Sequence, residues 1–135
     1  MRAIVCLDDR DGMLFHQRRQ SRDREVLRDI LEGLEGRRLW IRPISRSLFS
    51  GCPGEVLVEE DPFSKAGEED VCFVEDVPLA PVEGRLRSLT VYRWNRRYPG
   101  DFFLDINLEA GWRLTERREF PGHSHEVITK ECYTR

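Results

Sequence analysis

Two histidines separated by a single residue are the most conspicuous chemical groups of the chain. His123 and His125 flank Ser124, and alternate residues of an extended segment point the same way, so both rings can approach one metal ion. His16 and Glu126 are the available third ligands, and neither completes a spacing typical of a zinc site. We therefore expect a solvent-exposed turn here and no bound metal.

The cysteines offer no metal or redox motif. They stand at positions 6, 52, 72 and 132, and none forms a Cys-x-x-Cys pair. Cys6 and Cys72 fall inside apolar runs, where a free thiol behaves as a small hydrophobic side chain. The sequence also contains no Gly-x-Ser-x-Gly elbow and no phosphate-binding P-loop. We expect four reduced, structural thiols.

Charge is distributed unevenly. Arginines outnumber acids over residues 16–46, acids dominate residues 55–77, and the net charge is −3. This net charge argues against a general nucleic-acid-binding protein. Arg18 and Arg19 suit either a grip on a phosphate or acidic partner, or a solvated loop, and the solvated loop is favoured.

The bulk properties indicate one cytoplasmic domain over residues 1–135. This length is typical of a single domain, and an apolar share of 39% suffices for one core. No apolar run is long enough to cross a bilayer, and the start of the chain does not resemble a secretion signal. We therefore expect no contact with a membrane.

Short apolar runs predict the strands that must position any site. Residues 3–7 and 71–74 are continuous apolar runs, which are typical of central strands, so we expect them to be neighbours in the middle of a sheet. Further strands are expected at residues 39–44, 56–58, 86–94 and 102–104. Residues 112–120 and 126–133, joined by Pro121-Gly122, predict a C-terminal hairpin.

The helical signals are fewer. Ser21 suits the N-cap of a helix in which apolar residues recur at helical spacing up to Gly36. Residues 45–49 and 61–70 have room for about one turn each. Residues 8–20 are expected to form a long loop, and Cys52-Pro53-Gly54 a tight turn. This order predicts an α/β fold with a mostly parallel central sheet, a C-terminal antiparallel hairpin and few helices.

The order and spacing of these segments resemble dihydrofolate reductase along nearly the whole chain. The resemblance is carried by Ala3-Ile4-Val5-Cys6-Leu7, the turn at Asp11-Gly12, Ser21-Arg22-Asp23, Gly100-Asp101-Phe102-Phe103, Trp112 and His123-Ser124-His125. It implies the fold of that family. In that family one acid at the start of the first helix anchors the pterin ring, and the matching residue here is Asp23.

The resemblance implies a pocket for a flat nitrogen heterocycle. Asp23 would accept two parallel hydrogen bonds from the heterocycle, and Leu27, Val5, Phe49 and Tyr92 would line or fill the pocket. The helix dipole alone also favours an acid in the first helical turn, and both interpretations of Asp23 stay open. Because asparagine also suits a helix start, we expect Asp23→Asn to leave folding almost unchanged.

The segments that hold NADPH in that family differ here. Gly-Arg-x-Thr is replaced by Arg42-Pro43-Ile44-Ser45, in which only Ser45 fits as a cofactor-binding residue. The glycine run after the fifth strand reads Val74-Glu75-Asp76-Val77, and the segment for the 2′-phosphate reads Glu59-Glu60-Asp61. A carboxylate and a phosphate about 4 Å apart repel by about 1–4 kcal/mol. We therefore expect no NADPH and no other cofactor.

Three functions remain open from the sequence. The first is a non-catalytic, pteridine-like small-ligand-binding or regulatory protein without a functional NADPH site. The alternative is a divergent dihydrofolate or pteridine reductase that takes NADP in an altered pose, so the sequence does not decide whether the chain is an enzyme. The third is a protein-interaction module that uses the acidic residues 59–76, without indication of a particular protein partner.

Overall fold

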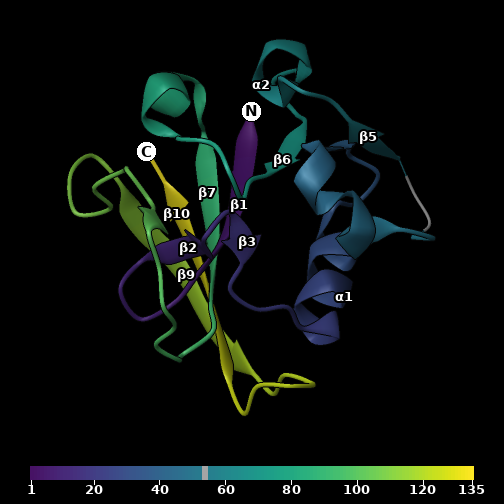
Figure 1. The fold of residues 1–135 in the computed structure, drawn as a ribbon. Coiled ribbons are helices and arrows are strands. Elements are labelled where there is room, and N and C mark those ends of the chain that lie inside the picture. The colour runs from purple at the N-terminus through teal and green to yellow at the C-terminus, as the bar shows by residue number, and fades with distance from the viewer. Residues whose placement is uncertain (53–54) are drawn as a thin grey trace.

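Two continuous apolar runs form the centre of the sheet, as the sequence predicts. In the computed structural model, which describes residues 1–52 and 55–135, β1 (Arg2–Leu7) lies between β6 (Val71–Phe73) and β7 (Ser88–Arg93) and runs parallel to both (Figure 1). Strands buried on both faces require apolar side chains throughout, which explains these runs.

The sheet has seven strands in the order β5-β4-β6-β1-β7-β10-β9. β4 (Leu39–Ile41) and β5 (Val56–Val58) extend the parallel part. β9 (Arg113–Phe120) and β10 (Ile128–Thr134) form the predicted antiparallel hairpin, and β10 pairs with β7. The predicted fold class, an α/β fold with a mostly parallel sheet and a C-terminal hairpin, is confirmed.

A second, three-stranded antiparallel sheet corrects the expectation of a long loop over residues 8–20. Its order is β3-β2-β8, with β2 at Gly12–Phe15, β3 at Arg18–Arg19 and β8 at Phe102–Phe103. The apolar side chains of β2 pair with β8, which follows almost ninety residues later, so no local signal marks β2 as a strand. This small sheet brings Arg19 and Gln20 toward the first helix.

The helices are short and few. α1 (Arg24–Gly33) begins after Asp23, which caps it by accepting a hydrogen bond from the Glu25 N–H. The predicted cap, Ser21, instead makes contacts described below. The other helices are α2 (Pro62–Lys65) and two 3₁₀ helices, η1 (Pro43–Phe49) and η2 (Ala80–Arg85). The predicted turn Cys52-Pro53-Gly54 includes residues 53–54, which lie outside the described residues.

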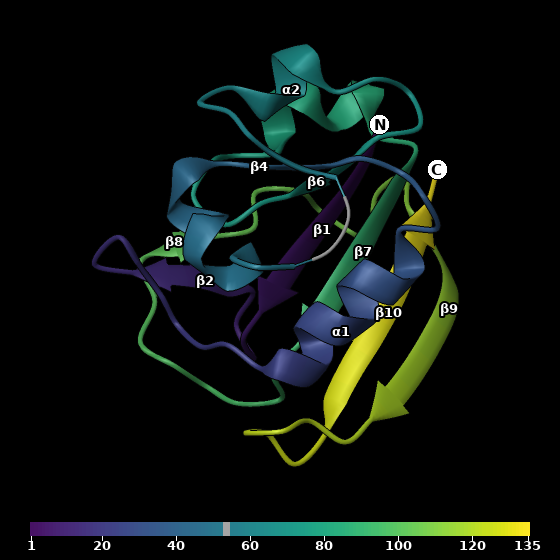
Figure 2. The same cartoon turned by 90° about the vertical axis from the view of Figure 1, so that its right-hand side faces the viewer.

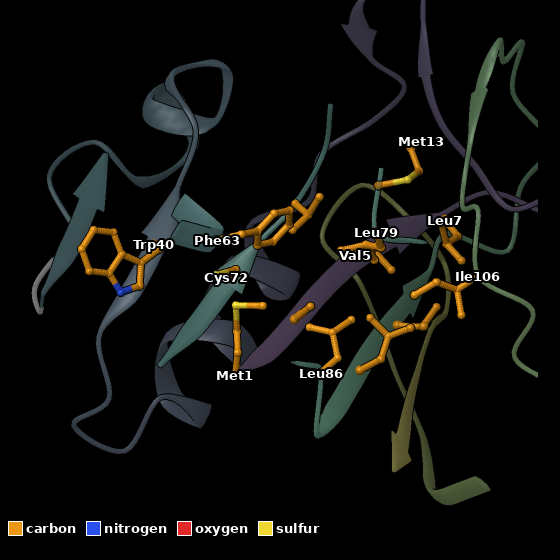
Figure 3. Packing of buried hydrophobic residues seen from close by; sticks show 14 of the residues in the cluster. Met1, Val5, Leu7, Met13, Trp40, Phe63, Cys72, Leu79, Leu86 and Ile106 are labelled. Carbon is orange, nitrogen blue, oxygen red and sulfur yellow. The ribbon is translucent and has the colours of Figure 1, made fainter. Parts of the chain in front are cut away.

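Two apolar clusters cover the two faces of the sheet. α1 lies across one face (Figure 2), where Val26 and Ile30 pack with Ile4 of β1 and Tyr92 of β7. The opposite face carries Val5 and Leu7, which project from β1 toward Leu79 and Ile106 (Figure 3). Successive residues of β1 therefore belong to different clusters, and only those on the face covered by α1 can reach a pocket on that face.

Candidate functional site

A pocket of about 410 Å³, its opening to solvent included, lies where the start of α1 meets β1, β6 and the small sheet. The apolar part of its wall comprises Cys6, Met13, Val26, Leu27, Leu48, Phe73, Val74 and Trp94. The polar part comprises Arg19, Gln20, Ser21, Arg22, Asp23 and Glu75.

Two of the five residues predicted for ligand binding line this pocket, Asp23 and Leu27. The structure does not bring the other three to it. Val5 faces the opposite side of the sheet, and its neighbour Cys6 lines the pocket instead. Phe49 is buried beside Phe73 at a ring distance of 5.3 Å, and Leu48, one residue earlier in η1, takes the place predicted for it.

Tyr92 lies away from the pocket on β7. It lines a second cavity and donates a 2.6 Å hydrogen bond to Asp29 of α1. Burial, followed by this hydrogen bond to a carboxylate, raises the pKa of Tyr92 above its ordinary value. Trp94, the residue directly after β7, lines the pocket that Tyr92 was predicted to fill.

Asp23 accepts hydrogen bonds from two segments, the start of α1 and the turn of the C-terminal hairpin. Its side chain is fully buried, and Oδ1 accepts from the N–H groups of Glu25 and His123, both at 2.9 Å. Oδ2 accepts from the Ser124 N–H at 2.9 Å, the Ser124 hydroxyl at 3.2 Å and the His125 ring at 2.9 Å. These donors occupy both oxygens, so in this arrangement Asp23 holds the hairpin turn against the start of α1.

The hydrogen bonds keep Asp23 ionised. Burial alone raises the pKa of a carboxyl group, but the bonds from the His123 N–H, the His125 ring and the backbone of Glu25 and Ser124 outweigh it, and the pKa of Asp23 falls far below its ordinary value. Asp23 is therefore an acceptor only. The His125 nitrogen that faces it, Nδ1, must carry the proton of the shared hydrogen bond.

His125 is buried, contrary to the expected exposed turn. Its relative exposure is 4%, whereas His123 is exposed. The Nε2 atom lies 3.0 Å from the Ser21 hydroxyl and 3.1 Å from the Tyr98 hydroxyl. Trp94 stacks on the ring with centroids 4.7 Å apart. Sequence reasoning missed this role because Ser21 and Asp23, which bind the two ring nitrogens, lie about a hundred residues away along the chain.

A second charged group closes the other side of the pocket. Arg19 donates two hydrogen bonds to Glu75, from Nε at 2.6 Å and from one terminal nitrogen at 2.7 Å. The buried Ser45 hydroxyl donates to the same carboxylate at 2.7 Å. Arg19 also donates to the Ile44 carbonyl. The arginine that the sequence suggested for a phosphate or acidic partner therefore binds an acid of its own chain.

The next acid along the chain is paired in the same way. Arg42 donates to Asp76 at 3.0 Å and lies 3.6 Å from the Glu60 carboxylate. Arg42 and Ser45 belong to the segment that the resemblance noted in the sequence matches to a phosphate-binding motif. Glu75 and Asp76 stand where the same resemblance implies glycines. Both arginines at this edge of the sheet thus have carboxylates of the chain as partners.

Gln20 carries an unsatisfied acceptor on the pocket wall. Its side-chain nitrogen donates to Asp8 at 3.2 Å and to the Pro99 carbonyl at 3.0 Å, which fixes the orientation of the amide. Its oxygen, Oε1, is buried and accepts no hydrogen bond from the described residues. A buried acceptor without a donor is costly, so a ligand or water donor at this atom is stabilising.

Comparison with solved structures identifies the architecture. Dihydrofolate reductase from Enterococcus faecalis, in a structure titled as a complex with NADP(H) and RAB-propyl, matches with a TM-score of 0.68, covering 99% of this chain and 95% of that one. The chain has a dihydrofolate-reductase-like fold. The sequence identity is 12%, so the likeness shows the fold alone. No protein-family model and no curated protein matches the sequence.

Two further observations bear on ligands of this dihydrofolate-reductase-like chain. Within residues 1–52 and 55–135, no group of three or more His, Cys, Asp or Glu side chains is arranged to hold a metal ion. No helix in that part of the chain is long and apolar enough to cross a membrane.

Proposed function

We propose that this chain is a small-ligand-binding protein that does not use NADPH and does not reduce its ligand. The observation that carries the proposal is the Arg19–Glu75–Ser45 cluster beside the pocket. In the family that the chain resembles, the cofactor phosphates lie near the residues after the strands β4 and β6. Here the same edge is filled by carboxylates that are already bound to arginines.

The residues present do not fit NADPH. A phosphate at this edge would have to displace Glu75 from two charge-assisted hydrogen bonds, which are the stronger kind of hydrogen bond. Glu75 and Asp76 would then face the phosphate without their partners, at a repulsion of about 1–4 kcal/mol per pair. These costs together would cancel micromolar affinity, which corresponds to about 8 kcal/mol.

The ligand that suits the pocket is small, flat and nitrogen-containing. The wall is mostly apolar and includes the aromatic rings of Phe73 and Trp94, which favours a planar ring. Gln20 Oε1 supplies a buried acceptor for one N–H donor. Because Asp23 is already engaged by its own chain, we assign the ligand's donor to Gln20, and direct contact with Asp23 stays a prediction. A pteridine is the ligand class with these features.

Titration with pterin tests the proposal. We expect saturable binding by the wild type in calorimetry, and at least tenfold weaker binding by Leu27→Trp, because Leu27 lines the pocket and the larger ring fills it. Leu31→Trp is the matched control, since Leu31 lies on the same helix but outside the pocket wall. Equal affinity in both variants, or no binding of pterin by the wild type, would contradict the proposal.

The alternative function is an NADPH-dependent reductase. It is favoured by the structural likeness to an enzyme whose structure is titled as a complex with NADP(H). Steady loss of NADPH absorbance in the presence of dihydrofolate would establish it. The same assay without dihydrofolate is the control for slow oxidation of NADPH.

A further inference from the structure

Three side chains beside the pocket have the arrangement of a nucleophile, a general base and the group that orients the base. The Ser21 hydroxyl lies 3.0 Å from His125 Nε2, and His125 Nδ1 lies 2.9 Å from Asp23 Oδ2. Both distances are within hydrogen-bond reach, the geometric requirement for such a set. A set of this kind is recognised by geometry and roles, because it recurs on unrelated folds in different chain orders.

The protonation pattern of the set follows from its hydrogen bonds. The ionised Asp23 can only accept, so His125 Nδ1 carries a proton, and Nε2 is the ring nitrogen left to take the proton of the Ser21 hydroxyl. Tyr98 donates toward Ser21 Oγ at 3.3 Å, so the serine hydrogen is free to point at Nε2. A neutral imidazole that accepts the hydroxyl proton is the state a general base needs.

The surroundings also suit the charged state that forms during reaction. The indole ring of Trp94 stacks on His125, and an aromatic face stabilises an adjacent cation. Ser124 and Tyr98 are the other polar side chains that contact the imidazole. The backbone N–H groups of Ser21 and Arg22 donate to no acceptor in the described chain, and free N–H groups beside the nucleophile can stabilise an oxyanion.

We propose that Ser21 is a nucleophile for acyl transfer from a small carboxylic ester, with His125 as general base and Asp23 as a positioning residue. Ser21 is half-buried and lines the pocket, so a short acyl group in the pocket can reach it. The inference shares the pocket with the proposed function but does not depend on a heterocyclic ligand.

The reaction balances without a further reagent. Ser21 Oγ attacks the carbonyl carbon while its proton moves to His125 Nε2, and the carbonyl oxygen becomes an oxyanion. The oxyanion collapses, the bond to the alcohol oxygen breaks, and that oxygen takes the proton from Nε2. Water then attacks the acyl-serine and gives a proton to Nε2. The bond between the acyl carbon and Ser21 Oγ then breaks, Oγ takes the proton back from Nε2, and the carboxylic acid is released.

Acetylation by p-nitrophenyl acetate tests this assignment on the full chain. We expect one acetyl group by intact mass, located on Ser21 by peptide mapping, with release of p-nitrophenol at the same rate. Ser21→Ala should lose the acetylation, whereas Ser47→Ala, at an exposed serine far from any histidine contact, should keep it. His125→Gln should slow it on the order of 100-fold, the scale of general base catalysis.

Two further variants separate catalysis from folding and from the neighbouring phenol. Tyr98→Phe removes the second hydroxyl at Nε2, and the acetyl group of this variant should still map to Ser21, whatever the change in its rate. Asp23→Asn should change the dependence of the rate on pH, because the imidazole loses the carboxylate that fixes its tautomer. Thermal midpoints of all variants identify any that fail to fold.

The results that would overturn the assignment are specific. They are acetylation of a residue other than Ser21, in the wild type or in Tyr98→Phe, or equal rates in the wild type and a folded His125→Gln variant. Absence of any acetyl-serine would also overturn it. Binding of pterin is measured separately, so failure of the acyl-transfer proposal leaves the binding proposal standing, and the reverse.

Discussion

Replacing Asp23 by asparagine should destabilise the fold strongly, although sequence reasoning expected almost no effect. Asparagine also suits a helix start, but one of its two polar atoms becomes an NH₂ group. That group would face either the N–H groups of Glu25 and His123 or the donors of Ser124 and His125. At least two hydrogen bonds to a charged acceptor are lost, and two buried donors face another donor.

The magnitude follows from those contacts. A hydrogen bond to a charged group contributes about 1.5–3 kcal/mol, so the loss of two should cost about 3–6 kcal/mol, a large share of the roughly 5–15 kcal/mol that stabilises a typical domain. With a urea m-value of about 2 kcal/mol per molar, the unfolding midpoint should fall by roughly 1.5–3 M. Asp9→Asn is the control, because Asp9 is exposed and its carboxylate accepts no hydrogen bond from the described residues.

The effect should also depend on pH in a defined direction. The pKa of Asp23 is lowered in the folded state from an ordinary value of 3.8, so its stabilisation is fully present above about pH 4 and is lost as the pH falls further. The difference between wild type and Asp23→Asn should therefore narrow in acid. A loss below about 1 kcal/mol at neutral pH, or a difference that does not change with pH, would refute this account of Asp23.

Three other predictions concern the surroundings of the pocket. Gly122→Ala should lower the thermal midpoint by several degrees, because a Cβ there would lie 2.7 Å from Asp23 Oδ2 and 2.7 Å from the His125 carbonyl oxygen; an unchanged midpoint would show that the turn adapts freely. Cys72 should react with a thiol reagent only on unfolding, because it is buried and burial raises its pKa to about 12; rapid labelling of Cys72 in the native protein would contradict its burial. Glu75→Gln should destabilise the protein by about 2–4 kcal/mol in urea titration, since Arg19 is left partly buried with a neutral partner; a variant as stable as wild type would show that the pair contributes little.

The sheet was predictable because its strands carry local signals. Continuous apolar runs marked β1 and β6 as central neighbours, and the Pro-Gly connection between two strand-like segments marked the β9–β10 hairpin. Because these runs are apolar throughout, the sequence does not show toward which face of the sheet each side chain points. A run buried on both sides shows no alternation, so Val5 was assigned to the pocket that Cys6 lines.

The candidate site was less predictable because its contacts are long-range. Ser21 and Asp23 are both good N-cap residues, and the choice between them depends on donors from a turn about a hundred residues later. Nothing near His125 in the sequence shows that it is buried against Asp23 and Trp94. The acids at the end of β6 were visible in the sequence, but their arginine partners were not.

Calorimetric titration of the purified chain with NADPH tests whether this pocket has lost the cofactor site. Because Glu75 and Asp76 occupy the arginines at the edge of the sheet where the cofactor phosphates would lie, we expect no saturable heat at micromolar cofactor. Saturable binding in the micromolar range would contradict the account and favour the reductase alternative.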